Sequence, residues 1–140
     1  MVAIRHNPFP VDPTYAGIYS HAVEVRGASR SLLVSGQVGV APDGTLPGDF
    51  EGQLEQAIAN LKAVLSAASM TVRHITKLSI FLTHREDIPT AIEVRKQHFD
   101  GVQPAITTVL VAGLVEPDWR VELEAVAVDE DRTIERGRWV

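Results

Sequence analysis

Val121-Glu122-Leu123-Glu124-Ala125-Val126-Ala127-Val128 is the most informative stretch of this sequence. If it forms a strand, alternate residues point to the same side, so Glu122 and Glu124 share one face of an otherwise apolar strand. Two carboxylates placed there repel each other and are costly to bury unless another group satisfies them. We therefore expect this face at a wet sheet edge, at a contact between subunits, or in a pocket.

The segment before this strand is expected to be its hairpin partner. Residues 105–113 have strand character, and a turn through residues 115–118 would lead into the final strand. The resulting register places Thr108 opposite Glu124 and puts Ile106 on the same face. A hydroxyl beside a carboxylate can hold a water molecule or a polar substrate. The alternative is a solvated surface with a satisfied Thr–Glu pair.

Three further strands and two helices are expected upstream. Apolar residues mark strands at 21–26, 31–34 and 77–83, and the polar turn between the first two predicts that they are adjacent. A second helix is expected from about Asp87, which can cap it, to about Phe99. The first helix is indicated by an apolar stripe with helical spacing, formed by Phe50, Leu54, Ile58, Leu61, Leu65 and Ala68.

The order of these elements predicts the fold class. Strand, strand, helix, strand, helix, strand, strand describes an α+β domain, with a mixed sheet and two helices packed on one face. The apolar strands leave the other face to be covered by neighbouring subunits. We expect one domain over residues 1–128 and a charged C-terminal extension over residues 129–140.

Composition limits the class of protein. The chain has 140 residues, enough for one buried core, with no Cys and a formal net charge of −5. The acidic charge argues against a nucleic-acid surface. No apolar run approaches the length of a membrane span, and the first residues lack the apolar core of a secretion signal. We expect a cytoplasmic protein without a nucleic-acid or membrane partner.

The sequence offers little for metal or phosphate chemistry. Its five His residues show no short metal-ligand spacing. It contains neither a Gly-rich phosphate loop nor the sequence of a nucleophile elbow. We therefore expect neither a metal nor another cofactor.

Five segments together carry a family resemblance. They are Gly17-Ile18-Tyr19-Ser20-His21-Ala22, Val34-Ser35-Gly36-Gln37, Asn60-Leu61-Lys62-Ala63-Val64-Leu65, Pro104-Ala105 and Val121-Glu122-Leu123-Glu124-Ala125-Val126-Ala127. In this order they resemble the Rid/YjgF family of reactive-intermediate deaminases, called L-PSP endoribonucleases in older naming. The resemblance covers roughly residues 15–128, which is nearly the whole chain.

The resemblance implies a fold, an assembly and a reaction. It implies a chorismate-mutase-like α+β fold assembled as a barrel-like homotrimer, with small-molecule pockets between subunits. It also implies cofactor-free hydrolysis of enamines and imines, such as 2-aminoacrylate and 2-iminopropanoate, to a keto acid and ammonia. By the same resemblance, Glu124 is the catalytic residue that places the hydrolytic water, and Tyr19, Ser35 and Gly36 bind substrate. Glu122 also matches the family pattern but is expected at a contact between subunits.

One position departs from the family pattern. The deaminating branch has an Arg directly after Pro-Ala that clamps the substrate carboxylate, whereas this chain has Ile106, followed by Thr107 and Thr108. Loss of a two-pronged Arg clamp is expected to weaken binding of a small 2-imino acid by at least about 10- to 100-fold. The sequence therefore predicts that these three residues line a pocket for a less acidic or more hydrophobic ligand.

Two classes of function remain open. In the first, the chain is an imine or enamine deaminase, in which Glu124 positions water and Thr108 or backbone amides replace part of the lost clamp. In the second, the homotrimer binds a small metabolite, or acts as an interaction module, without catalysis. An endoribonuclease is disfavoured by the acidic charge.

Gln37 is expected either in the pocket or bonded to its own backbone. Asn60 is expected to be solvated. Four Arg side chains are expected either at the solvated surface, which is the simpler interpretation, or near the pocket of a neighbouring subunit, namely Arg26, Arg30, Arg95 and Arg120.

Overall fold

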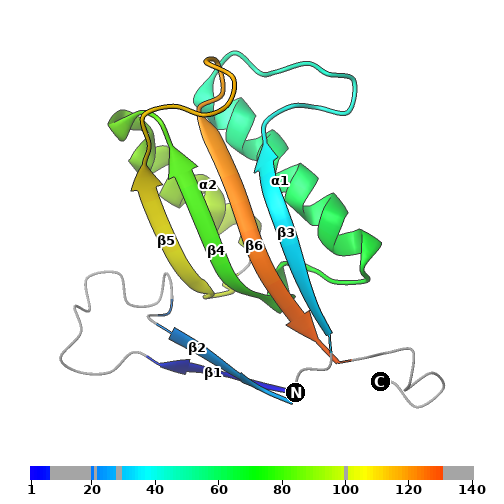
Figure 1. Ribbon diagram of the computed structural model, residues 1–140. Coiled ribbons are helices and arrows are strands. Elements are labelled where there is room, and N and C mark those ends of the chain that lie inside the picture. Colours follow the sequence, from blue (N-terminus) through cyan, green and yellow to red (C-terminus); the bar gives the residue numbers. More distant parts are fainter. Residues whose placement is uncertain (7–19, 21, 28–29, 100, 131–140) are drawn as a thin grey trace.

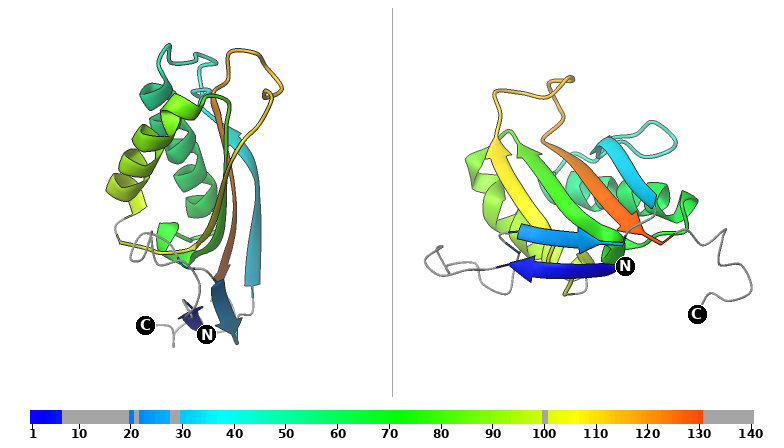
Figure 2. Two further views of the ribbon diagram at one scale, coloured as in Figure 1. Left: turned by 90° about the vertical axis from the view of Figure 1, so that its left-hand side faces the viewer. Right: turned by 60° about the horizontal axis from the view of Figure 1, so that its bottom comes forward.

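A sheet and two helices form two layers in the computed structural model (Figure 1). The structure describes residues 1–6, 20, 22–27, 30–99 and 101–130. The main sheet has four strands, β3 (Arg30–Val38), β4 (Ile75–Leu82), β5 (Ala105–Leu110) and β6 (Val121–Asp129). Two helices pack on one face of this sheet (Figure 2), namely α1 (Phe50–Ala67) and α2 (Ile88–Phe99). The predicted α+β fold is confirmed.

The strand order of the main sheet is β3-β6-β4-β5. β6 runs antiparallel to both β3 and β4, whereas β4 and β5 are parallel. A parallel pair needs a crossover connection, and α2 supplies it between β4 and β5. The sheet is therefore mixed, as the sequence predicted.

The expected hairpin between the last two strands was wrong. β4 lies between β5 and β6, and residues 111–120 carry the chain past the end of β4. Glu124 consequently lies opposite Ser79, and Thr108 lies opposite Ile80. The physical reason is that a central β4 has partners for its backbone groups on both sides. Local sequence pattern contains no information about which strand takes that central position.

The first two strands form a separate antiparallel pair, β1 (Val2–His6) with β2 (Ala22–Arg26). The pair lies at one end of the main sheet (Figures 1 and 2). The prediction that residues 21–26 pair with residues 31–34 was therefore wrong, and β1 was not foreseen. Every residue of the pair is exposed or half-buried. The alternation that identifies a half-buried strand is correspondingly weak in β1.

Side chains between the sheet and the helices form the hydrophobic core. α1 begins after Asp49, whose carboxylate accepts a hydrogen bond from the backbone N–H of Gly52. The predicted stripe of α1 is its buried face, which includes Phe50, Leu54, Ile58, Leu61 and Leu65. The sheet contributes alternate residues, including Leu78, Ile80, Leu82, Val121, Leu123, Ala125 and Ala127. Among the described residues, none of the helices is long and apolar enough to span a membrane.

Several polar side chains that were expected to be solvated are partly buried and bonded. Asn60 on α1 donates hydrogen bonds to two backbone carbonyls at the end of β3 and just beyond it. Arg30 joins the end of β6 to the end of α1. Arg120 donates to both carboxylate oxygens of Asp87, the residue expected to cap α2. Arg95 is buried, and burial lowers the pKa of its guanidinium.

Candidate functional site

The face of the sheet opposite the helices carries several polar residues of β4, β5 and β6. Core residues on β4 and β6 alternate with residues on this second face, which we call the open face. Pairing across the strands then defines its members, which are Leu33, Lys77, Ser79, Phe81, Thr107, Val109, Glu122, Glu124 and Val126. Ionisable, hydroxyl and apolar side chains are thus brought together on one surface.

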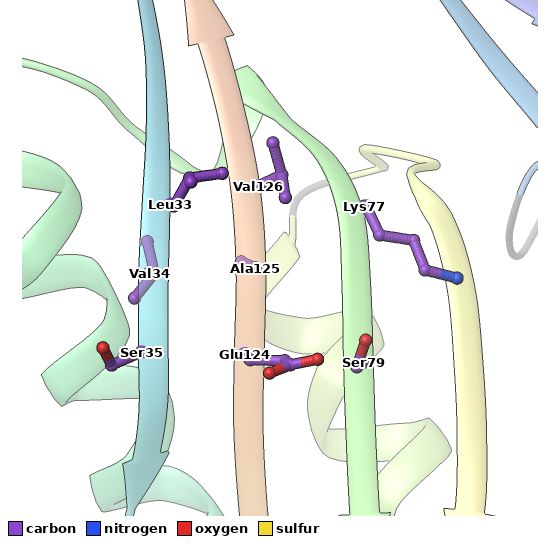
Figure 3. Close-up of a pocket in the computed structure, with 8 residues that line it drawn as sticks. All are labelled: Leu33, Val34, Ser35, Lys77, Ser79, Glu124, Ala125 and Val126. Carbon is purple, nitrogen blue, oxygen red and sulfur yellow. The ribbon is translucent and has the colours of Figure 1, made fainter.

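A hollow of about 320 Å³ lies in this open face. It is formed by β3, β6 and β4, and its lining residues are Leu33, Val34, Ser35, Lys77, Ser79, Glu124, Ala125 and Val126 (Figure 3). Glu124 is directed from β6 toward Ser79 on β4, and Lys77 extends from β4 over β5 (Figure 3). The hollow therefore holds one carboxylate and one ammonium group.

Glu124 belongs to a row of polar residues that crosses three strands. Ser79 on β4 pairs with Glu124 on one side and with Thr107 on the other. Thr107 also accepts a hydrogen bond of 2.7 Å from the Nζ of Lys77. Neither Lys77 nor Glu124 forms an ion pair with another described residue. Within the described part of the chain, both charges therefore lack a partner of opposite charge.

Glu122 lies on the same face, two residues before Glu124, and packs against Gly36. A Cβ atom added at Gly36 would lie 2.1 Å from Oε2 of Glu122. Gly36 follows Ser35 in the irregular part of β3, where the pairing with β6 shifts between Val34 and Gln37. The Glu122 carboxylate therefore occupies space that a side chain at position 36 would fill.

The structure brings together part of the predicted site. Ser35 and Glu124 line the hollow, although the Ser35 hydroxyl is directed away from Glu124 (Figure 3). Thr107 lies on the open face beside Lys77. Tyr19 lies outside the described residues.

Two predicted residues lie on the other side of the sheet. Ile106 pairs with Leu78, a core residue, and packs against the hydrophobic core. Thr108 pairs with Ile80, another core residue. The expected face shared by Ile106, Thr108 and Glu124 was therefore wrong, because it depended on the hairpin that β4 interrupts.

Lys77 and Ser79 are the functional candidates that sequence reasoning missed. The strand was interpreted as buried because Leu78, Ile80 and Leu82 dominate it. The polar residues at 77 and 79 alternate with that core set, and this alternation was the available signal.

Gln37 follows the simpler of its two interpretations. Its side-chain Nε2 donates to the backbone carbonyl of Ser35 at 3.1 Å. The side chain therefore supports the local backbone of β3 at the irregularity beside the hollow. Within the described part of the chain, no three His, Cys, Asp or Glu side chains gather where they could hold a metal ion.

Comparison with known proteins identifies the family. The Endoribonuclease L-PSP family matches residues 10–129. The chain is 36% identical over 118 residues to the 2-iminobutanoate/2-iminopropanoate deaminase of Mus musculus, covering 83% of this chain and 84% of that protein. The chain therefore belongs to the Endoribonuclease L-PSP family, which is the Rid/YjgF family that the sequence resembled.

Solved structures agree with this assignment. The Rid-family protein YyfB of Yersinia pestis superposes with a TM-score of 0.82 at 28% identity, covering 92% of this chain and 100% of that one. The structure of Escherichia coli TdcF with bound serine gives a TM-score of 0.68 at 35% identity, covering 80% of this chain and 88% of that one. Members of this fold thus include a protein that holds a small amino acid.

Proposed function

We propose that this chain is a cofactor-free hydrolytic deaminase of an imine or enamine metabolite. The observation that carries the proposal is the Glu124 carboxylate, which lines the open-face hollow without an ion pair to another described residue. A carboxylate free of a cation can accept a proton from water. The mouse relative named as an iminobutanoate/iminopropanoate deaminase supports the same reaction class.

The reaction would need one water molecule and no oxidant. Glu124 would take a proton from water as the oxygen attacks the imine carbon and would pass it to the nitrogen, which gives a neutral carbinolamine. Glu124 would then move the hydroxyl proton to the nitrogen as the C–N bond breaks, so that a carbonyl product and ammonia leave and the carboxylate is restored. Ser79, opposite Glu124 in the register, would supply a hydroxyl to the water or to the nitrogen.

The position of Ile106 in the structure does not support the expectation of a less acidic or more hydrophobic substrate. That expectation rested on an apolar residue at position 106, but Ile106 packs toward the helices. The groups that line the hollow are better guides to the charge of the substrate.

We also propose that the chain assembles as a homotrimer and that neighbouring subunits cover the open face, because Leu33 there is 77% exposed.

Imine hydrolysis in wild-type and substituted proteins tests the reaction. Imines are generated in situ by an amino-acid oxidase, and the decay rate above the spontaneous rate is measured. We expect Glu124→Gln to lower kcat by about 100-fold or more, because a general base contributes on that scale. Glu93→Gln is the control, since Glu93 is an exposed carboxylate on α2 in the opposite layer.

The same assay discriminates the remaining alternatives. If Glu122→Gln abolishes turnover and Glu124→Gln does not, the catalytic carboxylate is the one packed against Gly36. If wild-type protein accelerates neither acidic nor neutral imines, the deaminase proposal fails. The non-catalytic alternative, a trimer that binds a small metabolite, would then take its place.

A further inference from the structure

The ammonium group of Lys77 lies at the β5 side of the open-face hollow. Lys77 lies on β4 and shares the open face with Ser79, two residues further on. Its Nζ donates a hydrogen bond to Thr107 on the neighbouring strand β5. The side chain therefore extends over β5 (Figure 3).

The hydrogen bond to Thr107 leaves capacity for a ligand. An ammonium group has three N–H donors, and Thr107 accepts from one of them. The Thr107 hydroxyl then keeps its own proton to donate. Lys77 and Thr107 together can thus present several donors to one anionic group at the β5 side of the hollow.

The opposite charge lies at the other side of the hollow. Glu124 projects from β6, and Ser79 separates it from the β5 side. A ligand that satisfies both groups carries an anion at one end and a nitrogen that donates protons at the other. Charge complementarity of this kind also fixes the orientation of the ligand.

We propose that Lys77, positioned by Thr107, is the residue of this chain that binds the carboxylate of an imine or enamine substrate, so that Lys77 discriminates acidic from neutral substrates. This inference rests on the proposed deaminase function and specifies the residue that recognises the acidic group of the substrate. It places the substrate nitrogen toward Glu124 and Ser79, where the proton transfers occur. It also explains how a chain with Ile106 can accept an acidic substrate, because the cation comes from β4.

Steady-state kinetics on two imines of similar size test the inference. One imine carries a carboxylate and is made by an amino-acid oxidase, and the other is neutral and is made by an amine oxidase. We expect Lys77→Met to raise KM for the acidic imine about tenfold, since a hydrogen bond to a charged group is lost. The KM for the neutral imine and both kcat values are expected to change less than about twofold, because the proton transfers use other groups.

Three variants serve as controls for charge and position. Lys77→Arg retains the cation and is expected to recover most of the affinity. Thr107→Val removes the hydroxyl that holds Lys77 and is expected to raise KM for the acidic imine about threefold, an intermediate effect. Lys96→Met makes the same charge change on an exposed position of α2 and is expected to change nothing. Equal effects of Lys77→Met on both imines would overturn the inference.

A binding experiment separates this inference from the deaminase proposal. NMR titrations compare 2-oxobutanoate with its uncharged primary amide, which lacks the carboxylate. We expect wild-type protein to prefer the acid about tenfold and Lys77→Met to lose that preference. If this occurs without turnover of any imine, the deaminase proposal fails and the anion site stands. If wild-type protein shows no preference for the acid, the anion site is wrong whatever the turnover.

Discussion

At the scale of single residues, two glycines of β3 and the turn after it show how closely the chain approaches its neighbours. A Cβ at Gly36 would meet the carboxylate end of Glu122, whereas a Cβ at Gly39 would meet the backbone of Gln53 at 2.6 Å. The end of a side chain can swing aside, but a helix backbone cannot. We therefore expect Gly39→Ala to destabilise by about 1–3 kcal/mol and Gly36→Ala by less than about 1 kcal/mol. Urea unfolding measures both.

The Gly36 substitution also tests the placement of Glu122. In a Glu122→Ala background the obstructing carboxylate is gone, so adding Gly36→Ala is expected to change stability and activity no further. Gly36→Ala alone is expected to displace the carboxylate and to alter turnover only if Glu122 contributes to it. An equal loss of stability from Gly36→Ala in both backgrounds would show that Glu122 does not occupy this space.

At the scale of secondary structure, local periodicity predicted individual helices and strands better than it predicted which strands lie side by side. The stripe of α1 and the alternation of β6 are properties of their own segments, and both were recognised. Strand order is not such a property, so the position of β4 between β5 and β6 was missed. Part of the candidate site, the Lys77 side chain, depends on that strand order. Ser35 and Glu124 were found through family motifs, whereas Lys77 joins them only because β4 pairs with β6.

An ion pair joins the residue before β6 to the residue before α2. Arg120, just before β6, donates to both oxygens of Asp87, whose side chain is only 8% exposed. Arg120 also lies over the Phe50 ring, with its guanidinium carbon 5.8 Å from the ring centre. We expect Arg120→Met to destabilise by about 2–3 kcal/mol, because it leaves a buried carboxylate unpaired.

The ion pair has its own controls in urea unfolding. Arg120→Lys keeps the charge without the planar fork and is expected to recover only part of the loss. Adding Asp87→Leu to Arg120→Met removes the unpaired carboxylate and is expected to restore part of the stability. If Arg120→Met unfolds at the wild-type urea concentration, the pair does not stabilise the fold.

Gln53 connects α1 to two connecting segments. Its Nε2 donates to the carbonyls of Pro47 and Asp118, and its Oε1 accepts from the backbone N–H of Arg120. We expect Gln53→Leu to destabilise by about 2–3 kcal/mol, because three partly buried hydrogen bonds to the backbone are lost. The control is Gln97→Leu on an exposed position of α2, expected to change the free energy of unfolding by less than about 0.5 kcal/mol. Equal effects of the two substitutions would contradict the role of Gln53.

At the scale of the whole molecule, the open face is chemically suited to catalysis but poorly enclosed. Its hollow combines Lys77, Ser79 and Glu124, yet Leu33 at its rim is 77% exposed. Proton transfers at a carboxylate are favoured when surrounding water is excluded, since electrostatic interactions strengthen in a drier site. A neighbouring subunit on this face would cover the apolar residues and enclose the hollow at the same time.

Assembly and activity should therefore be lost together. Leu33→Glu places a charge where we propose that a second subunit packs, so we expect it to shift the protein from trimer to monomer. Light scattering coupled to size-exclusion chromatography measures the mass, and imine decay measures the activity of the same fractions. Val115→Glu is the matched control, because Val115 is 84% exposed on the connection between β5 and β6. A wild-type monomer with full activity would show that one subunit suffices, and that the open-face hollow works without a cover.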